Sequence, residues 1–304
     1  MNKKFKMTKT IANFLLFFIA ALWGSGFVVT KIAVNAYLTA GFITFSRGLL
    51  FALFAFIFFY KRILKMNKDA FKVGLVVGLL NVGGYLTQTV GIKYTTPSNN
   101  AFLTSTYVVF LPLVAWIFYK KRLKVQKLIA IILCLLGTAI LTNVFANGLS
   151  FNKGDLLSLL CAVFYASSIA FLSYSAKTTD YAVVAFMIAL VQTIGGFAYF
   201  IVIEKASTVG VNWSEVILPV LYMGIMCSFV AQTIQVIAQK HTSATTAGLI
   251  MMLEGLFGSI FSVAYGFEPF TIQLAVGGLI IMGSLSMMEV DWTRLINRNF
   301  KRTG

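Results

Sequence analysis

Charged side chains are scarce in this sequence of 304 residues. Only 11% of it is Asp, Glu, Lys or Arg, and the acidic residues number nine. A soluble domain carries about 25% charged residues, so this chain cannot cover itself with groups that water solvates. It is instead 59% hydrophobic, with a mean hydropathy of +0.87. These properties exclude a water-soluble globular protein and indicate that most of its surface contacts lipid.

Cysteine and histidine are also rare, with three copies and one copy. Cys134, Cys161 and Cys227 each lie within an apolar run without CxxC spacing, which argues against a disulfide framework or a metal site. His241 is the single histidine, and no HExxH motif, Gly-rich phosphate loop or pair of intramembrane carboxylates accompanies it. We therefore expect no metal, no cofactor and no enzymatic activity.

Long apolar runs dominate the chain. A helix needs about 20 residues to cross the roughly 30 Å of hydrocarbon in a bilayer. Ten runs approach this length, and the short connections between them leave no room for a soluble domain. The fold class expected is an all-α integral membrane protein with ten transmembrane helices. The runs are 11–30, 38–60, 73–92, 98–119, 128–144, 156–175, 181–203, 216–238, 244–265 and 272–288.

Basic residues are distributed unequally between the two sides that ten spans define. The side of the termini holds twenty Lys and Arg, whereas the other holds Lys31, Lys93, Lys153 and Lys205. Because basic residues gather in cytoplasmic loops, we expect both termini in the cytoplasm and the protein in the cell (inner or plasma) membrane. Basic residues clustered in these loops can bind the negatively charged headgroups of anionic membrane lipids. A nucleic-acid partner would need a basic stripe interleaved with aromatics, which is missing.

The chain divides into two similar halves, residues 11–145 and 154–290. Each contains five runs, and a shift of 146 places lays the stretch from 92 to 103 over the stretch from 238 to 249. An odd number of spans per half puts the halves in opposite orientations. Inverted repeats with a binding site between them are a recurring plan of secondary transporters.

Six short segments of the sequence form a recognisable set. They are LWGSGF at 22–27, FSRGLL at 45–50, GIKYTTPSNNAFLT at 91–104, YVVFLPL at 107–113, AQKHTSATTA at 238–247 and LE at 253–254. Together they resemble the ten-span EamA-type transporters of the drug/metabolite transporter superfamily. The family often has Pro after this Glu, where this chain has Gly255. The resemblance implies efflux or exchange of metabolites, amino acids or drugs without ATP, and it does not name a substrate.

Polar side chains recur at helical spacing within the apolar runs. In lipid they are costly unless they face the bundle interior or a partner, and the spacing places several on shared faces. They either line a path for a small polar solute or only hydrogen-bond neighbouring helices. The candidate path residues are Asn81, Tyr85 and Gln88; Asn100, Thr104 and Tyr107; Gln232 and Gln235; the aromatic Trp23 and Tyr165; and Glu254.

Two charged residues within the runs carry separate expectations. Glu254 lies about ten residues into the ninth run, hence about 15 Å deep, where it should be neutral unless it is paired. It either exchanges protons or meets a cationic substrate group, or it only hydrogen-bonds a neighbouring helix. Arg47 lies deep in the membrane if its helix starts at Leu38, and it reaches the outer interface if the helix starts near Phe42. We expect a structural role or a contact with lipid headgroups.

The leading interpretation is a secondary transporter, an exporter or exchanger, that moves a small-molecule substrate by alternating access. Proton coupling through Glu254 and function as a monomer or a homodimer are compatible with it. Two alternatives use the same spans. A membrane-embedded lipid-modifying enzyme would need a catalytic set, and a non-transporting scramblase or assembly subunit would show no saturable solute binding.

The charge distribution makes a testable prediction about topology. A fluorescent or phosphatase reporter fused after Gly304 should report a cytoplasmic C-terminus, because twenty basic residues lie on that side against four on the other. A readout from the far side of the membrane would mean that a span has been miscounted.

Overall fold

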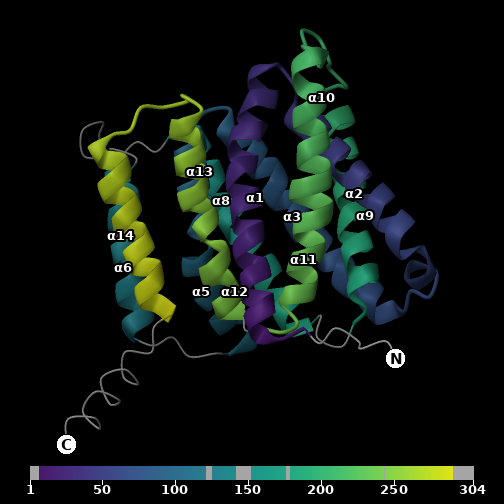
Figure 1. The fold of residues 1–304 in the computed structure, drawn as a ribbon, viewed down its shortest axis with the longest axis horizontal. Coiled ribbons are helices and arrows are strands. Elements are labelled where there is room, and N and C mark those ends of the chain that lie inside the picture. The colour runs from purple at the N-terminus through teal and green to yellow at the C-terminus, as the bar shows by residue number, and fades with distance from the viewer. Residues whose placement is uncertain (1–6, 121–124, 142–151, 176–178, 243, 290–304) are drawn as a thin grey trace, which may run out of the picture.

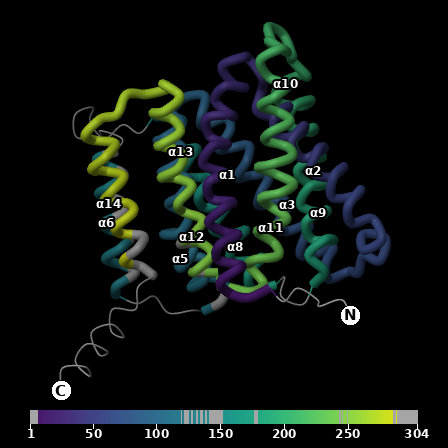
Figure 2. Tube along the Cα trace, in the orientation of Figure 1, coloured from purple at the N-terminus to yellow at the C-terminus, as the bar shows by residue number. Residues whose placement is uncertain are grey.

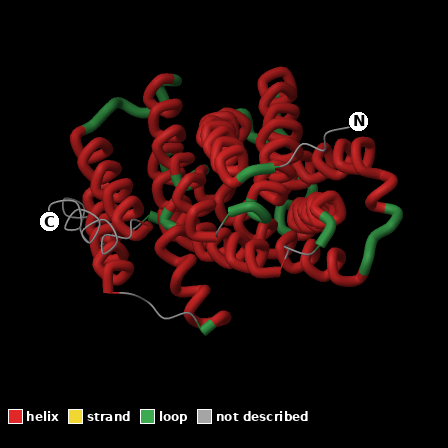
Figure 3. Tube along the Cα trace, turned by 60° about the horizontal axis from the view of Figure 1, so that its bottom comes forward, coloured by secondary structure: helices red, strands yellow, loops and turns green. Residues whose placement is uncertain are grey.

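The computed structural model describes residues 7–120, 125–141, 152–175, 179–242 and 244–289. These residues fold into helices joined by short loops, without a strand (Figure 3), so the expected all-α membrane class is confirmed. The helices are α1 (Lys9–Asn35), α2 (Ala40–Ile63), α3 (Lys68–Ile92), α4 (Pro97–Ser105), α5 (Tyr107–Tyr119), α6 (Val125–Leu141), α8 (Lys153–Ser175), α9 (Tyr181–Val202), α10 (Trp213–Tyr222), η1 (Met223–Val230), α11 (Ala231–Ala238), α12 (Ala244–Met251), α13 (Leu253–Ala264) and α14 (Ile272–Glu289).

These helices combine into ten rods, one for each expected run, within the described part of the chain. α4 and α5 follow each other across Thr106, α12 and α13 follow each other across Met252, and α10, η1 and α11 are continuous. Eight rods are long and apolar enough to cross a membrane by length and composition. The other two, α6 and α14, pack against each other at one edge of the bundle (Figure 1).

The sequence supplies the groups that begin these helices. In hydrocarbon, backbone polar groups must be satisfied internally, and the first N–H groups of a helix have no partner within it. Side-chain oxygens one residue before the helix accept hydrogen bonds from them, as Thr and Asn commonly do. Such caps are Thr8 for α1, Asn67 for α3, Thr96 for α4, Asn152 for α8, Asp180 for α9 and Thr271 for α14.

The halves run in opposite directions and pack on each other through equivalent helices. Lys31, near the end of α1, donates to the Ile92 carbonyl at the end of α3, and Lys153 at the start of α8 lies over the Tyr94 ring of the same end. α8 therefore begins where α1 ends. The pairs α3–α8 and α1–α11 correspond to each other when the halves are exchanged, and α1 runs between α13 and the α10–α11 rod (Figure 2).

The most extensive contact between the halves joins α2 to α9. A Cβ atom at Gly196 would lie 2.3 Å from the backbone nitrogen of Phe45, and one at Gly48 would lie 2.5 Å from that of Thr193. Only glycine permits such close backbone approach, which is how helices in lipid gain contact area. The two helices therefore meet backbone to backbone.

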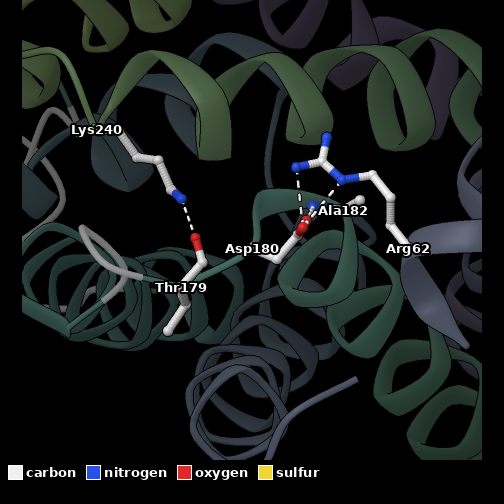
Figure 4. Close-up of polar contacts among 5 residues, drawn as sticks. All are labelled: Arg62, Thr179, Asp180, Ala182 and Lys240. Atoms are coloured by element: carbon white, nitrogen blue, oxygen red, sulfur yellow. Dashed lines mark hydrogen bonds and ion pairs between the residues drawn. The ribbon is translucent and has the colours of Figure 1, made fainter. Parts of the chain in front are cut away.

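Polar contacts hold the α2–α9 pair at both ends. At one end both Glu204 carboxylate oxygens lie 3.0 Å from the Gly41 backbone N–H, at the start of α2. At the other, Arg62 pairs with Asp180, the cap of α9, at 2.9 Å, beside the Lys240 ammonium that donates to the Thr179 carbonyl (Figure 4). A carboxylate thus stands at the N-terminus of each helix, where the helix dipole favours it.

The glycine contacts predict a specific sensitivity to one added methyl group. Gly196→Ala should lower the free energy of unfolding by about 1–3 kcal/mol, because the new methyl group overlaps the α2 backbone. Gly283→Ala in α14 is the matched control, since nothing lies within 4 Å of its Cβ position. Thermal unfolding of the purified proteins in detergent measures both. Equal stability of the two variants would contradict the close α2–α9 packing.

Candidate functional site

The rods surround a partly open cavity, with about 590 Å³ of empty volume when its open side is included, and helices from both halves form its wall. The first half contributes α1, α2, α3 and α5, and the second contributes α8, η1, α11 and α13. Aromatic rings, amides and two ionisable side chains form the wall, as in sites for small polar molecules. The lining residues are Trp23, Gly26, Phe27, Thr30, Arg47, Asn81, Tyr85, Gln88, Tyr107, Tyr165, Ser168, Ile169, Cys227, Gln232, Gln235 and Glu254.

Nine of the eleven candidate path residues from the sequence line this cavity; Asn100 and Thr104 do not. The Asn100 side-chain N–H₂ donates to the Ser158 hydroxyl of α8 at 2.8 Å and to the Gln88 carbonyl of α3 at 3.3 Å. The Thr104 hydroxyl accepts from the Gln88 side chain at 3.5 Å. Both residues therefore connect neighbouring helices, which was the alternative considered for the polar positions.

An interruption of the fourth rod separates these two residues from the cavity. Between α4 and α5 the Val109 N–H donates to the Thr106 carbonyl at 2.8 Å, three residues back instead of four. Such a tight turn changes the direction of the side chains that follow it. Tyr107 consequently lines the cavity, although a regular helix would place it on the face of Asn100 and Thr104.

The ninth rod is interrupted at the equivalent position, Met252. The Gly255 N–H donates to the Met252 carbonyl at 3.0 Å with the same three-residue spacing. The shift of 146 places maps Thr106 onto Met252. Tyr107 and Glu254 follow the two interruptions by one and two residues, so both interrupted rods present a polar side chain to the cavity.

Hydrogen bonds between the halves run through the cavity wall. The Ser168 hydroxyl of α8 donates to the Asn81 side-chain oxygen of α3 at 3.0 Å. Asn81 in turn donates to the Gln232 side-chain oxygen of α11 at 3.3 Å, and Gln232 donates to the Tyr85 hydroxyl at 2.5 Å. Tyr85 meets Tyr165 edge-on, with ring centroids 5.8 Å apart. The amides of α3 and α11 thus join the halves and line the cavity at once.

The π-helix η1 orients two side chains from the first half. The Trp23 indole N–H donates to the Cys227 carbonyl at 2.9 Å, and Arg47 Nε donates to the Ser228 hydroxyl at 3.1 Å. Wide π-helical turns are rare and often occur at functional sites. The segment MGIMCSFV at 223–230 has the composition of any apolar helix, so the sequence does not signal this turn.

Arg47 and Glu254 line the cavity, and neither forms an ion pair with a described residue. α2 begins at Ala40, and Arg47 lies inside the bundle at 5% exposure. Glu254 is also 5% exposed and forms no hydrogen bond to a described residue, so the helix-packing alternative has no bond to support it. Within the described residues no group of three or more His, Cys, Asp or Glu is placed to hold a metal ion.

Further polar contacts between the halves lie at the two ends of the bundle. Where α4 begins, the Thr95 hydroxyl donates to Asp155 at 2.8 Å, and the Ser98 backbone N–H donates to Glu268 at 3.0 Å. At the opposite end Arg62 pairs with Asp180 (Figure 4). Side-chain contacts of this kind can be broken and remade singly, unlike the backbone contact of α2 with α9.

Comparison with known proteins agrees with this architecture. A solved crystal structure superposes with a TM-score of 0.70 at 18% identity, covering 94% of this chain and 99% of that one, which shows the fold. An uncharacterized transporter of Archaeoglobus fulgidus is 33% identical, over 89% of this chain and 83% of its own length. Solute carrier family 35 member F2 of Mus musculus is 23% identical, over 87% and 71%.

The sequence profile of the EamA-like transporter family matches the chain twice, over residues 10–143 and 152–289. These two matches cover most of the sequence, and each contains one set of five rods. The chain is a multi-pass integral membrane protein and belongs to the EamA-like transporter family.

Proposed function

We propose that this protein is a secondary transporter that carries a small solute across the membrane through the cavity between its halves. The observation that carries the proposal is the cavity itself, which both halves wall and which contains ionisable and hydrogen-bonding groups without partners. Arg47 and Glu254 face it without an ion pair to any described residue, and the buried Tyr107 hydroxyl has no hydrogen-bond partner among those residues. Buried polar groups are normally hydrogen-bonded to protein, water or a ligand, so these groups could bind a polar solute that enters the cavity.

The moving units in this proposal are the two halves, residues 11–145 and 154–290. Alternating access requires that each end of the cavity opens in turn while the other is closed. The contacts that Asp155 and Glu268 make at one end, and the Arg62–Asp180 pair at the other, are the side-chain links that would break. The protein would lie in the cell membrane with both termini in the cytoplasm, as an exporter or exchanger.

Glu254 is proposed to bind a proton or a cationic group of the solute. It follows the interruption at Met252, so its side chain enters the cavity from a discontinuous helix, as coupling groups of transporters often do. A change in the direction of α12 relative to α13 would move the carboxyl group between the two ends of the cavity.

The cavity predicts which positions water reaches. Single cysteines at Asn81, Gln88, Gln232 and Gln235, in a background without the three native cysteines, should react with small hydrophilic thiol reagents, and a transported solute should slow the reaction. Two matched controls should react slowly: Leu79 of α3, which is exposed on the outside of the bundle, and Val236 of α11, which is buried in the core. Equal rates at all six positions would assign the amides to helix packing.

Glu254→Gln tests the proton or cation site. The amide keeps the size of a protonated carboxyl group but cannot titrate, so expression and thermal stability should be preserved while pH-dependent transport is abolished. Flux of solutes found by screening amino acids, their analogues and cationic drugs in proteoliposomes, between about pH 5.5 and 8, measures this. Glu215→Gln, an exposed residue outside the cavity, should retain the pH dependence. Wild-type transport by Glu254→Gln across this range would reject the site.

A further inference from the structure

Arg47 is a buried cation that forms no ion pair with a described residue. It lies in α2 at 5% exposure, faces the cavity, and has no carboxylate within ion-pair distance among the described residues. Arginine cannot discharge itself by losing a proton. A buried charge without a partner is strongly unfavourable, so a site of this kind is expected to take its opposite charge from a ligand.

The contacts of Arg47 leave one side of its guanidinium group open. Nε donates to the Ser228 hydroxyl at 3.1 Å, and the guanidinium carbon lies over the Tyr85 ring, 4.3 Å from its centroid. The two terminal nitrogens make no hydrogen bond to a described residue. These nitrogens form the parallel fork that binds both oxygens of a carboxylate.

The surroundings hold this fork in one orientation. Ser228 belongs to the π-helix η1, and Tyr85 is fixed by the hydrogen bond that Gln232 donates to its hydroxyl. Because that hydroxyl oxygen accepts a bond from Gln232, the hydrogen of Tyr85 remains free to donate. The free groups on this side of the cavity are therefore hydrogen-bond donors, and a ligand that meets them must supply acceptors.

We propose that Arg47, supported by Tyr85 and Ser228, binds a carboxylate group of the transported solute. This inference rests on the proposed transport function and adds to it a chemical class, a carboxylic acid in its ionised form. Arg47 is thereby a specificity-determining residue, and Ser228 is a positioning residue that acts through it. The carboxylate would lie between α2, α3 and η1, so both halves of the protein contact the same group.

The test compares carboxylates with the corresponding amides, which lack the carboxylate charge. Benzoate, phenylacetate, lactate and phenylalanine, with benzamide, phenylacetamide, lactamide and phenylalaninamide, are titrated into purified protein in detergent. Calorimetry and tryptophan fluorescence, to which Trp23 in the cavity wall contributes, are the readouts. Wild-type protein should bind at least one carboxylate saturably and its amide about 10- to 100-fold more weakly, which is what a hydrogen-bonded charge contributes.

Variants of Arg47 test whether the preference for carboxylates over amides depends on this residue. Arg47→Gln should weaken carboxylate binding about 10- to 100-fold, to the affinity of the amide. Arg47→Lys keeps the positive charge but lacks the two parallel N–H groups, so its affinity for the carboxylate should fall about tenfold. Ser228→Ala should bind the carboxylate a few-fold more weakly and should still prefer it to the amide. Lys61→Gln, an exposed cation on the same helix, should bind as wild type. If Arg47→Gln does not fold, Arg47→Lys and Ser228→Ala carry the test.

Three results would overturn the assignment. These are wild-type carboxylate affinity in folded Arg47→Gln, equal binding of carboxylates and amides by the wild type, and the absence of binding by any carboxylate. Displacement of bound carboxylate by phosphatidylglycerol alone would assign Arg47 to lipid headgroups instead. Saturable binding confined to the amides would reject the carboxylate assignment but not the proposed transport through the cavity. Failure of the cysteine labelling would instead reject the cavity as the transport path.

Discussion

Helices in a bilayer gain little hydrophobic free energy by meeting one another, so this bundle depends on how closely its backbones approach. The α2–α9 pair provides the closest contact, through Gly48 and Gly196, and it joins one half to the other. Glu204 and Asp180 stand at the two helix starts of that pair. With this contact in place, the remaining rods can surround a cavity instead of filling it, because the halves do not need the cavity wall to stay together.

Much of this arrangement follows from the sequence, because the bilayer restricts it so strongly. Apolar runs of fixed length locate the rods, and an odd number per half requires the inversion that the positions of α1 and α8 confirm. Helical periodicity also indicates which polar residues share a face. On α3 and α11 this was sufficient, since Asn81 and Gln232 both line the cavity and bond each other.

Periodicity fails where a helix stops being regular. Asn100, Thr104 and Tyr107 share a face only if the helix continues unbroken, and the interruption at Thr106 sends the third residue to the cavity while the first two bond α3 and α8. The position of Arg47 could not be read from the sequence for a related reason. Its depth depends on where α2 begins, and its orientation depends on Ser228, which belongs to a π-helical turn that composition does not reveal.

The π-helix has a consequence for the energetics of the proposed cycle. If the two halves were identical, a two-fold axis in the membrane plane would relate the inward- and outward-facing states, and this symmetry would make their free energies equal. η1 interrupts the eighth rod, whereas its counterpart α3 is a regular helix, and α9, the counterpart of α2, contains no arginine. Equality is therefore not enforced in the proposed cycle, and an empty carrier that works in this way would favour one side of the membrane, where its solute must reach it.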